Sequence, residues 1–593
     1  LAALVAFGLW HKLDNPQFDI VDLSVDRRGA VAIAETYLKT RGIDPQKFIH
    51  AVAFENDQQG DAYLQKVLGL RGEKEFSKRQ EYEFFYWRVR FFKELKKEEY
   101  DFKISPASGF IINFKHLIDD IEPRETLAKD AALQKARDFF VKAYGLNMQD
   151  YDFNEEKTKR YEHRLDYTFS WEKKNAYIPW GKDEGVAKLL ATATVAGSEI
   201  TEFYKNKLEP PEKFKRYFNN NLILAEYLYS LYMILFTLLV GLAASIMIMK
   251  RHVFDMAITK KWFINMGVFL FIANIAYVFN ILQTIIIKYQ TMSKLSSFIG
   301  LYLTRIGTYM VLFNVIFIVP ALAGEALHAQ SSTRNKYASF SYYVRTGLFN
   351  RGITRTVVFG YLLFFIFLGV QAVIFYLGQK YLGVWKEWIR LTEFSSAYLL
   401  FFSAFVIGLN AGIGEELTFR LFGINFFKVY FKNTALAVVL TAFIWGLGHS
   451  GYAIFPVWFR ILEVGILGLI YGSLYIRYGI ISLIIAHYLF DVFWGSAPHL
   501  LGHSSLVQFV GAVAVMALPL LFAFIAYVMN RQENEREVKI MLNKTQEYNL
   551  NILINFVNLK HSQGVSPGAL RDELLSHNWD PALVDLAIKQ TYV

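Results

Sequence analysis

The stretch YLLFFSAFVIGLNAGIGEELTFR, residues 398–420, combines a membrane-like apolar run with three charged side chains. Glu415, Glu416 and Arg420 stand at the end of that run. A charge at the middle of a bilayer costs about 2.5–3.5 kcal/mol on insertion scales, and ionisable groups in membrane segments are candidates for function. The stretch therefore predicts a membrane helix that carries a functional polar site.

The composition fits a membrane protein with soluble parts. Of 593 residues, 54% are hydrophobic, 17% aromatic and 20% charged, and the formal net charge is +10. The basic residues fall largely in loops and in one soluble segment, which indicates membrane topology and not nucleic-acid binding. The chain has no cysteine. This excludes disulfides, thiolate zinc sites and cysteine nucleophiles, so a metal would need His and carboxylate ligands.

Apolar runs of roughly 20 residues, enough to span a bilayer, recur after residue 215. With residues 1–11, interpreted as the end of an N-terminal transmembrane helix, they predict about ten membrane helices. The other runs lie near residues 222–249, 262–287, 296–323, 355–380, 395–430, 434–452, 459–476, 480–497 and 505–529. The predicted fold is mainly α: a polytopic helical bundle (216–530) with a soluble α+β domain (12–215) and a helical tail (531–593).

The charged loops predict an orientation. Basic residues gather in alternate loops, which the positive-inside rule places in the cytoplasm. The α+β domain is then extracytoplasmic and the tail cytoplasmic, in what we take to be a bacterial plasma membrane. The richer loops hold Lys250, Arg251, Lys260 and Lys261, and then Arg334, Lys336, Arg345, Arg351 and Arg355, whereas the loop at 288–295 is poorer and Glu387 and Glu393 balance the loop at 381–394.

The soluble domain contains a repeat of about 100 residues, at about 24–120 and 121–209. Each unit has an amphipathic helix with a Gly-containing turn, at 29–48 and 131–151, followed by alternating strands and a hairpin, at 100–118 and 188–208. This pattern resembles the PepSY-like domain, which is often attached to secreted or membrane proteases. A generic α+β ectodomain is the alternative. The tail ends in two predicted short helices joined at NWDP.

Six polar residues fall in three successive apolar segments: Glu415, Glu416, Arg420, His449, His487 and Asp491. On an α-helix Glu416 and Arg420 share a face, as do His487 and Asp491, whereas Glu415 points about 100° away from Glu416. A turn near Lys432 would bring the glutamates and His449 to similar depth. Each pair alone could be structural, but three such segments together favour a functional site. Glu463, three residues from Arg460, is expected to form a local ion pair.

The three segments resemble the motifs of the CPBP intramembrane metalloprotease family of CaaX-processing and bacteriocin-processing proteases. EELTFR fits its E-E-x-x-x-R motif, WGLGH (445–449) its F-x-x-x-H motif with Trp445 in place of Phe, and HYLFD (487–491) its H-x-x-x-N/D motif. The resemblance covers residues 395–497 and implies hydrolysis of a peptide bond within or near the membrane.

The resemblance implies roles for the six residues. Glu415 would be the general base that activates water, with His449 beside it; Arg420 would hold Glu416 as a supporting carboxylate; His487 and Asp491 would orient water or stabilise the oxyanion. Alternatively, Glu415, His449 and His487 bind Zn²⁺, which activates the water. The substrate would be a peptide precursor or a membrane protein.

Two other functions fit parts of the sequence. A transporter would distribute its charges along a pathway or repeat them between halves, but here the polar set lies in one third of the chain. A non-catalytic scaffold or immunity-type protein could keep the fold. The sequence leaves two directions for the opening of the site. A straight helix from a cytoplasmic turn at Lys432 puts Glu415 about 25 Å away, past the midplane of the membrane. Family analogy instead favours a cytoplasmic opening. A kinked or re-entrant helix at 410–416 would reconcile the two.

Overall fold

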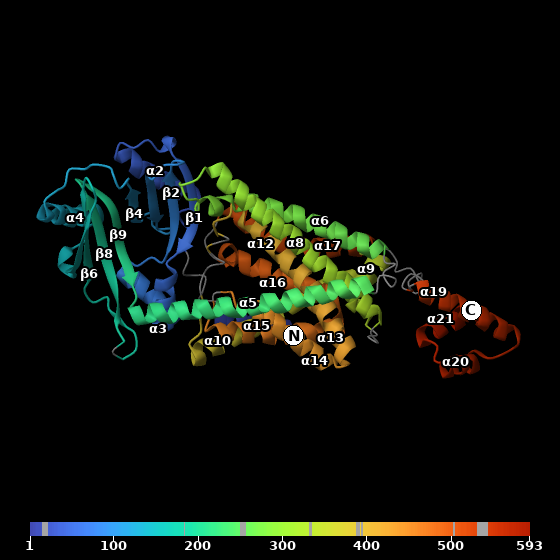
Figure 1. Ribbon diagram of the computed structural model, residues 1–593. Helices are drawn as coiled ribbons and strands as arrows, with labels where there is room; N and C mark the ends of the chain where they lie inside the picture. Colours follow the sequence, from blue (N-terminus) through green and yellow to red (C-terminus); the bar gives the residue numbers. More distant parts are fainter. Residues whose placement is uncertain are drawn as a thin grey trace.

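The computed structural model describes residues 1–593 except 15–21, 183, 250–256, 331–334, 387–391, 393–394, 453, 502–504, 530–541, 543 and 593. An antiparallel sheet domain lies at one end of a long helix bundle (Figure 1). This confirms the predicted fold class. Of the charges used to predict the orientation, Lys250, Arg251, Arg334, Glu387 and Glu393 lie outside the described residues.

Two units of the same order build the sheet domain. The first has α2 (Arg27–Thr40), η2 (Pro45–Lys47), β1 (Ile49–Asn56), α3 (Gln58–Gln80), β2 (Phe85–Phe92), β3 (Glu99–Ile104) and β4 (Ile111–Leu117). The second has α4 (Lys129–Tyr144), η3 (Met148–Asp150), β5 (Tyr151–Arg160), β6 (Leu165–Lys173), β7 (Ile178–Pro179), β8 (Val186–Ala196) and β9 (Glu199–Glu209). The strand order β1-β2-β3-β4-β9-β8-β6-β5 joins the units edge to edge. Helix α3 has no counterpart in the sequence-based prediction.

Helices α2 and α4 pack on the sheet through stripes of small residues. Both helices bury residues spaced four apart, which lie on one face of a helix. These are Ala30, Ala34 and Leu38 in α2, and Ala132, Ala136 and Phe140 in α4. All six belong to one core with the sheet phenylalanines, so both units share a single hydrophobic core.

Glu199, the first residue of β9, links the two units by charge. Its carboxylate accepts a hydrogen bond from Arg124 at 2.5 Å and lies 3.3 Å from His116 Nδ1 and 3.2 Å from Arg41. Burial by itself would raise the pKa of Glu199, but the hydrogen bonds and charges of His116 and Arg124 outweigh it and lower the pKa to about 2.

The helix bundle follows the predicted apolar runs. It contains α1 (Ala2–Asp14), α5 (Glu212–Met249), α6 (Ala257–Asn280), α7 (Leu282–Ile286), α8 (Leu295–Gln330), η5 (Lys336–Ala338), α9 (Phe340–Thr346), α10 (Arg351–Leu382), α12 (Leu400–Leu409), η6 (Asn410–Ile424), α13 (Asn425–Phe431), α14 (Thr434–Leu447), α15 (Val457–Tyr478), α16 (Ile480–Leu501) and α17 (Leu506–Met529). In the described part of the chain, eight helices are long and apolar enough to cross a membrane, and Ala2–Leu13 and Thr434–Leu447 are shorter apolar helices. Eight of the ten predicted spans are therefore matched by helices of spanning length, and the other two by shorter apolar helices.

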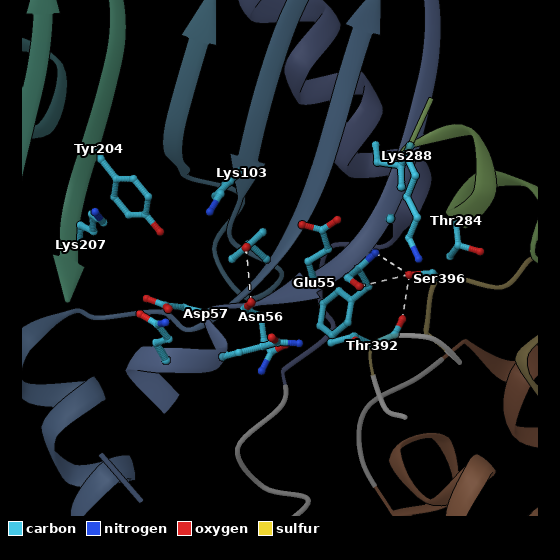
Figure 2. A pocket seen from close by; sticks show the side chains of 16 residues that line it. Glu55, Asn56, Asp57, Lys103, Tyr204, Lys207, Thr284, Lys288, Thr392 and Ser396 are labelled. Carbon is cyan, nitrogen blue, oxygen red and sulfur yellow. Dashed lines mark hydrogen bonds between the residues drawn. The ribbon is translucent and has the colours of Figure 1, made fainter. Parts of the chain in front are cut away.

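The sheet domain is docked on the bundle through the free edge of β1. The Ser396 hydroxyl accepts from the Phe54 amide at 2.7 Å and donates to the Phe54 carbonyl at 3.2 Å, and Gln283 accepts from the Val52 amide at 3.1 Å. A cavity of about 530 Å³ lies beside this contact, lined by Lys103 and Tyr204 of the sheet and by Thr284 and Lys288 of the bundle, among others (Figure 2). Specific hydrogen bonds therefore hold the sheet domain against the bundle.

A second link joins the sheet domain to the loop that follows α14. The short strands β10 (Trp385–Lys386) and β11 (Ile454–Phe455) pair, and the Trp385 and Phe455 rings stack with centroids 4.2 Å apart. Both rings belong to the core of the sheet domain, together with Phe218 of α5. The end of the bundle that carries the α14–α15 loop is therefore the end beside the sheet domain.

The C-terminal region forms three helices, α19 (Lys544–Ser562), α20 (Pro567–Ser576) and α21 (Pro581–Thr591), around their own core. Two of them, α20 and α21, flank the predicted junction at NWDP. The third, α19, lies within the predicted helical tail, although its bounds were not predicted.

Candidate active site

The glutamate motif lies on a π-helical segment. Helix α12 continues without re-entry through η6 into α13, so that Leu400–Phe431 is one helical span. Within η6 the backbone bonds run from residue i to i+5, a form that often marks functional sites. The predicted α-helical geometry at Glu415 and Glu416 is therefore wrong. The reason is that the apolar pattern of a helix does not distinguish the two backbone forms.

Glycines bring this segment close to α16. A Cβ atom at Gly412 would lie 2.9 Å from the Ile484 carbonyl oxygen and 3.0 Å from the Tyr488 amide nitrogen. A Cβ at Gly408 would meet Val492 at 2.7 Å. Small residues permit such close approach of helix backbones in membranes, and this approach brings the glutamates to the helix that carries His487.

Glu416 is the buried centre of the site. Its side chain is fully inaccessible, and Oε1 accepts a hydrogen bond from His487 Nδ1 at 2.7 Å and lies 3.2 Å from Arg420 Nη1. Because the carboxylate accepts from Nδ1–H, a neutral His487 ring carries its lone pair on Nε2. Glu416 therefore fixes the orientation of His487.

Arg420 is held by aromatic faces as well as by charge. Its guanidinium carbon lies 4.1 Å from the centre of the Trp445 ring and 4.8 Å from that of Tyr471. Cation–π contacts of this kind strengthen where water is excluded. Arg420 thus balances the charge of Glu416 from a fixed position.

The side chain of Glu415 points away from that of Glu416 and is more exposed. Its side chain is 31% exposed, whereas that of Glu416 is 0% exposed. Oε2 accepts a hydrogen bond from Trp445 Nε1 at 2.5 Å and lies 4.0 Å from His487 Nε2. Asp491 Oδ2 lies 3.9 Å from the same His487 nitrogen. Glu415, His487 and Asp491 therefore surround one polar space.

Contacts with Trp445 hold the His449 side chain in position. Its Nδ1 donates to the Trp445 carbonyl oxygen at 2.9 Å, and its ring stacks on Tyr452 with centroids 5.1 Å apart. The Trp445 ring meets the His449 ring edge-on at 5.1 Å. The same tryptophan thus touches Glu415, Arg420 and His449.

The structure brings the three predicted segments together. Glu416 contacts both Arg420 and His487, Glu415 faces His487, and His449 joins them through Trp445. Sequence reasoning treated Trp445 only as an aromatic replacement for Phe and missed its contacts. The indole N–H was an available signal, because a buried Trp N–H usually finds an acceptor.

The predicted zinc site does not fit these side-chain positions. Two ligands of a tetrahedral zinc ion lie about 3.3 Å apart when each bond is about 2.0–2.1 Å long. Glu415 Oε2 and His487 Nε2 are 4.0 Å apart. Within the described residues, no group of three or more His, Asp or Glu side chains is arranged to hold a metal ion.

Comparisons with known proteins find similarity over this region. Residues 397–493 match the family model described as type II CAAX prenyl endopeptidase Rce1-like. The sporulation-killing factor biosynthesis protein SkfC of Bacillus subtilis (strain 168) is 30% identical over 131 residues, which cover 21% of this chain and 25% of that protein. The chain thus spans a quarter of the length of this relative, and no solved structure matches. The membrane region that carries all six candidate residues is Rce1-like, as the three motifs predicted.

Proposed function

We propose that this chain is an intramembrane endopeptidase that cleaves a peptide bond in a membrane-associated protein or peptide with water activated by Glu415. The observation that carries the proposal is the difference between two adjacent carboxylates. Glu416 is buried against Arg420 and His487, whereas Glu415 is partly open and faces His487 Nε2. Two carboxylates in contrasting environments are typical of a division between a supporting group and a reacting group.

The polar space between Glu415 and His487 suits a water molecule. Two atoms 4.0 Å apart can both bond a water at about 2.8 Å, with an angle of about 90° at its oxygen. In the proposed step Glu415 removes a proton from this water while the water oxygen bonds to the scissile carbonyl carbon. The electron pair of the C=O π bond moves to the carbonyl oxygen.

The remaining groups act on that oxyanion and on the leaving nitrogen. His487, held by Glu416 and protonated on Nε2, donates to the oxyanion, and Asp491, 3.9 Å from that nitrogen, helps to orient the water. When the C–N bond breaks, the proton held by Glu415 passes to the leaving amine. The products are a carboxylate and an amine, and His449 borders the site on the side of Trp445.

Location and substrate are part of the proposal. We place the chain in a bacterial plasma membrane with the sheet domain outside, the tail inside and the site opening toward the sheet domain. The position of the α14–α15 loop beside that domain supports this opening. The name of the relative concerns biosynthesis of a sporulation-killing factor, which favours a peptide precursor as substrate. The PepSY-like domain would contact that substrate.

The test is cleavage of a peptide library by purified protein in detergent. Glu415→Gln should abolish cleavage, whereas Glu463→Gln should retain it. Glu463 is a matched control because it is also a buried membrane glutamate, paired with Arg460 as predicted and bonded by Gln371 at 2.9 Å. Equal cleavage by wild type and Glu415→Gln would refute the role of Glu415. A chelator should leave the rate unchanged, and loss of activity that zinc reverses would instead support the metal alternative.

A further inference from the structure

The middle of α5 lies against the candidate site with no fully buried side chain. From residue 226 to residue 238 no side chain is buried. The helix is anchored on both sides of this segment, by Phe214 and Phe218 in the core of the sheet domain and by Leu239 and Ala243 in the bundle core. Figure 1 shows α5 running from the sheet domain along the bundle. The segment is therefore a span between two fixed ends.

Three aromatic rings form one stripe on this segment. Tyr229, Tyr232 and Phe236 follow the spacing of a single helix face, and their successive ring centroids lie 5.7 and 5.4 Å apart. Phe236 meets Phe419 of η6 at 6.0 Å. Phe419 directly precedes Arg420, so the Phe236 end of the stripe lies on η6, the segment that carries Glu415 and Glu416.

The other end of the stripe lies on the loop that holds His449. A Cβ atom at Gly448 would meet the Tyr232 ring at 2.8 Å, and one at Gly451 would meet the Tyr229 ring at 3.4 Å. The two glycines flank His449, and they let the rings approach the loop backbone. The stripe thus covers a surface formed by both halves of the candidate site.

We propose that this surface is where the substrate binds, and that α5 occupies it until an apolar, aromatic segment of the substrate takes its place. The inference rests on the proposed function. A substrate segment of the same chemistry as residues 226–238 makes the same ring contacts on the Gly448–Gly451 loop and on Phe419. Displacing the segment loses the packing of Tyr232 and Phe236 on the bundle core, which the rings of the substrate segment replace, while the two anchored ends keep the helix attached.

A disulfide between α5 and the loop tests this directly, because the chain has no other cysteine. The Cβ position at Gly451 lies 3.9 Å from the Tyr229 Cβ, within the roughly 3.5–4.5 Å of a disulfide. In Tyr229→Cys/Gly451→Cys, oxidation should lower cleavage of a membrane-inserted peptide by about 100-fold or more, because the binding-competent fraction falls. Reduction should restore it.

Gly423→Cys/Thr441→Cys is the matched control. Its Cβ positions lie 3.8 Å apart, and its disulfide joins η6 to α14 away from α5. Cleavage by this variant should be the same in its oxidised and reduced forms. The proposal would be overturned if oxidised and reduced Tyr229→Cys/Gly451→Cys cleaved at the same rate. It would also be overturned if the disulfide between residues 229 and 451 did not form.

A binding experiment separates this inference from the proposed catalysis. The probe is a fluorescent peptide with the sequence AEYLYSLYMILFTLL, residues 225–239, added to the full chain in nanodiscs. The reduced double variant should bind it, and the oxidised form should not. Equal binding by both forms refutes the proposed surface even if neither form cleaves any substrate. Binding without cleavage by the wild type would refute the protease function alone.

Discussion

Trp445→Phe isolates the hydrogen bond that holds Glu415. The substitution removes the indole N–H that donates to Glu415 Oε2 at 2.5 Å. It keeps an aromatic face beneath Arg420, whose guanidinium lies 4.1 Å from the ring centre. Phe is the residue of the family motif at this position, so the change is compatible with the fold.

The expected loss follows from the charge of the acceptor. A hydrogen bond to a charged group contributes about 1.5–3 kcal/mol, and each 1.4 kcal/mol changes a rate by about tenfold. If Glu415 must be held for proton transfer, kcat should fall about 10- to 100-fold while KM changes little, because the bond acts on the reacting geometry. His449 keeps its own bond, since the Trp445 carbonyl is a backbone group.

The assay is steady-state cleavage of a peptide in detergent, with thermal unfolding measured on the same samples. Trp458→Phe is the matched control, because Trp458 is 47% exposed on α15 and its ring lies beside Phe459. An unchanged kcat in Trp445→Phe would refute the reasoning and show that only the aromatic ring is needed. A large fall in the melting temperature would show that the bond is structural instead.

Further predictions concern stability, pH and metals. Arg420→Met should destabilise the protein by about 3–5 kcal/mol in thermal unfolding, because it leaves the buried Glu416 without its cation. Glu199→Gln should destabilise it by about 1–2 kcal/mol at neutral pH, a value discounted for the 30% of the side chain that stays exposed. The folded pKa of Glu199, about 2, lies below its ordinary value of 4.5, so its contribution is present above pH 4.5 and is lost as pH falls through 2. Denaturant unfolding of both proteins from pH 7 to pH 2 should show this difference disappear. Dialysis against a chelator should leave the rate of peptide cleavage unchanged.

The sequence predicted the local pairs better than the long-range ones. The i,i+4 spacing predicted the pairing of Glu416 with Arg420, which lie 3.2 Å apart. The main partner of His487 is Glu416, 71 residues earlier, at 2.7 Å, and not Asp491 at 3.9 Å. Periodicity reports which residues share a face of one helix. It does not report which face of a second helix meets them, so this contact could not be derived.

The same limit applies to helices and repeats. Apolar runs predicted the membrane spans, and alternating strands predicted the hairpins of the sheet domain. Helix α3 was missed because its residues show no clear apolar face: it contains Gly69 with a non-helical backbone and buries the polar residues Asp61 and Glu73. The apolar pattern identifies a helix only where one face is consistently apolar.

Glu415 and Glu416 are adjacent in the sequence, but their surroundings in the structure differ strongly. This difference lets us propose different roles for them. Glu416 lies with a cation, a histidine and two aromatic rings, so its charge is compensated inside the bundle. Glu415 has one fixed donor and faces a polar space. A buried charge without a partner would be strongly destabilising, so Glu416 depends on Arg420 and His487 for its place inside the bundle. In the proposed reaction Glu415, which is partly exposed, exchanges the proton with water, and Glu416 supports the site.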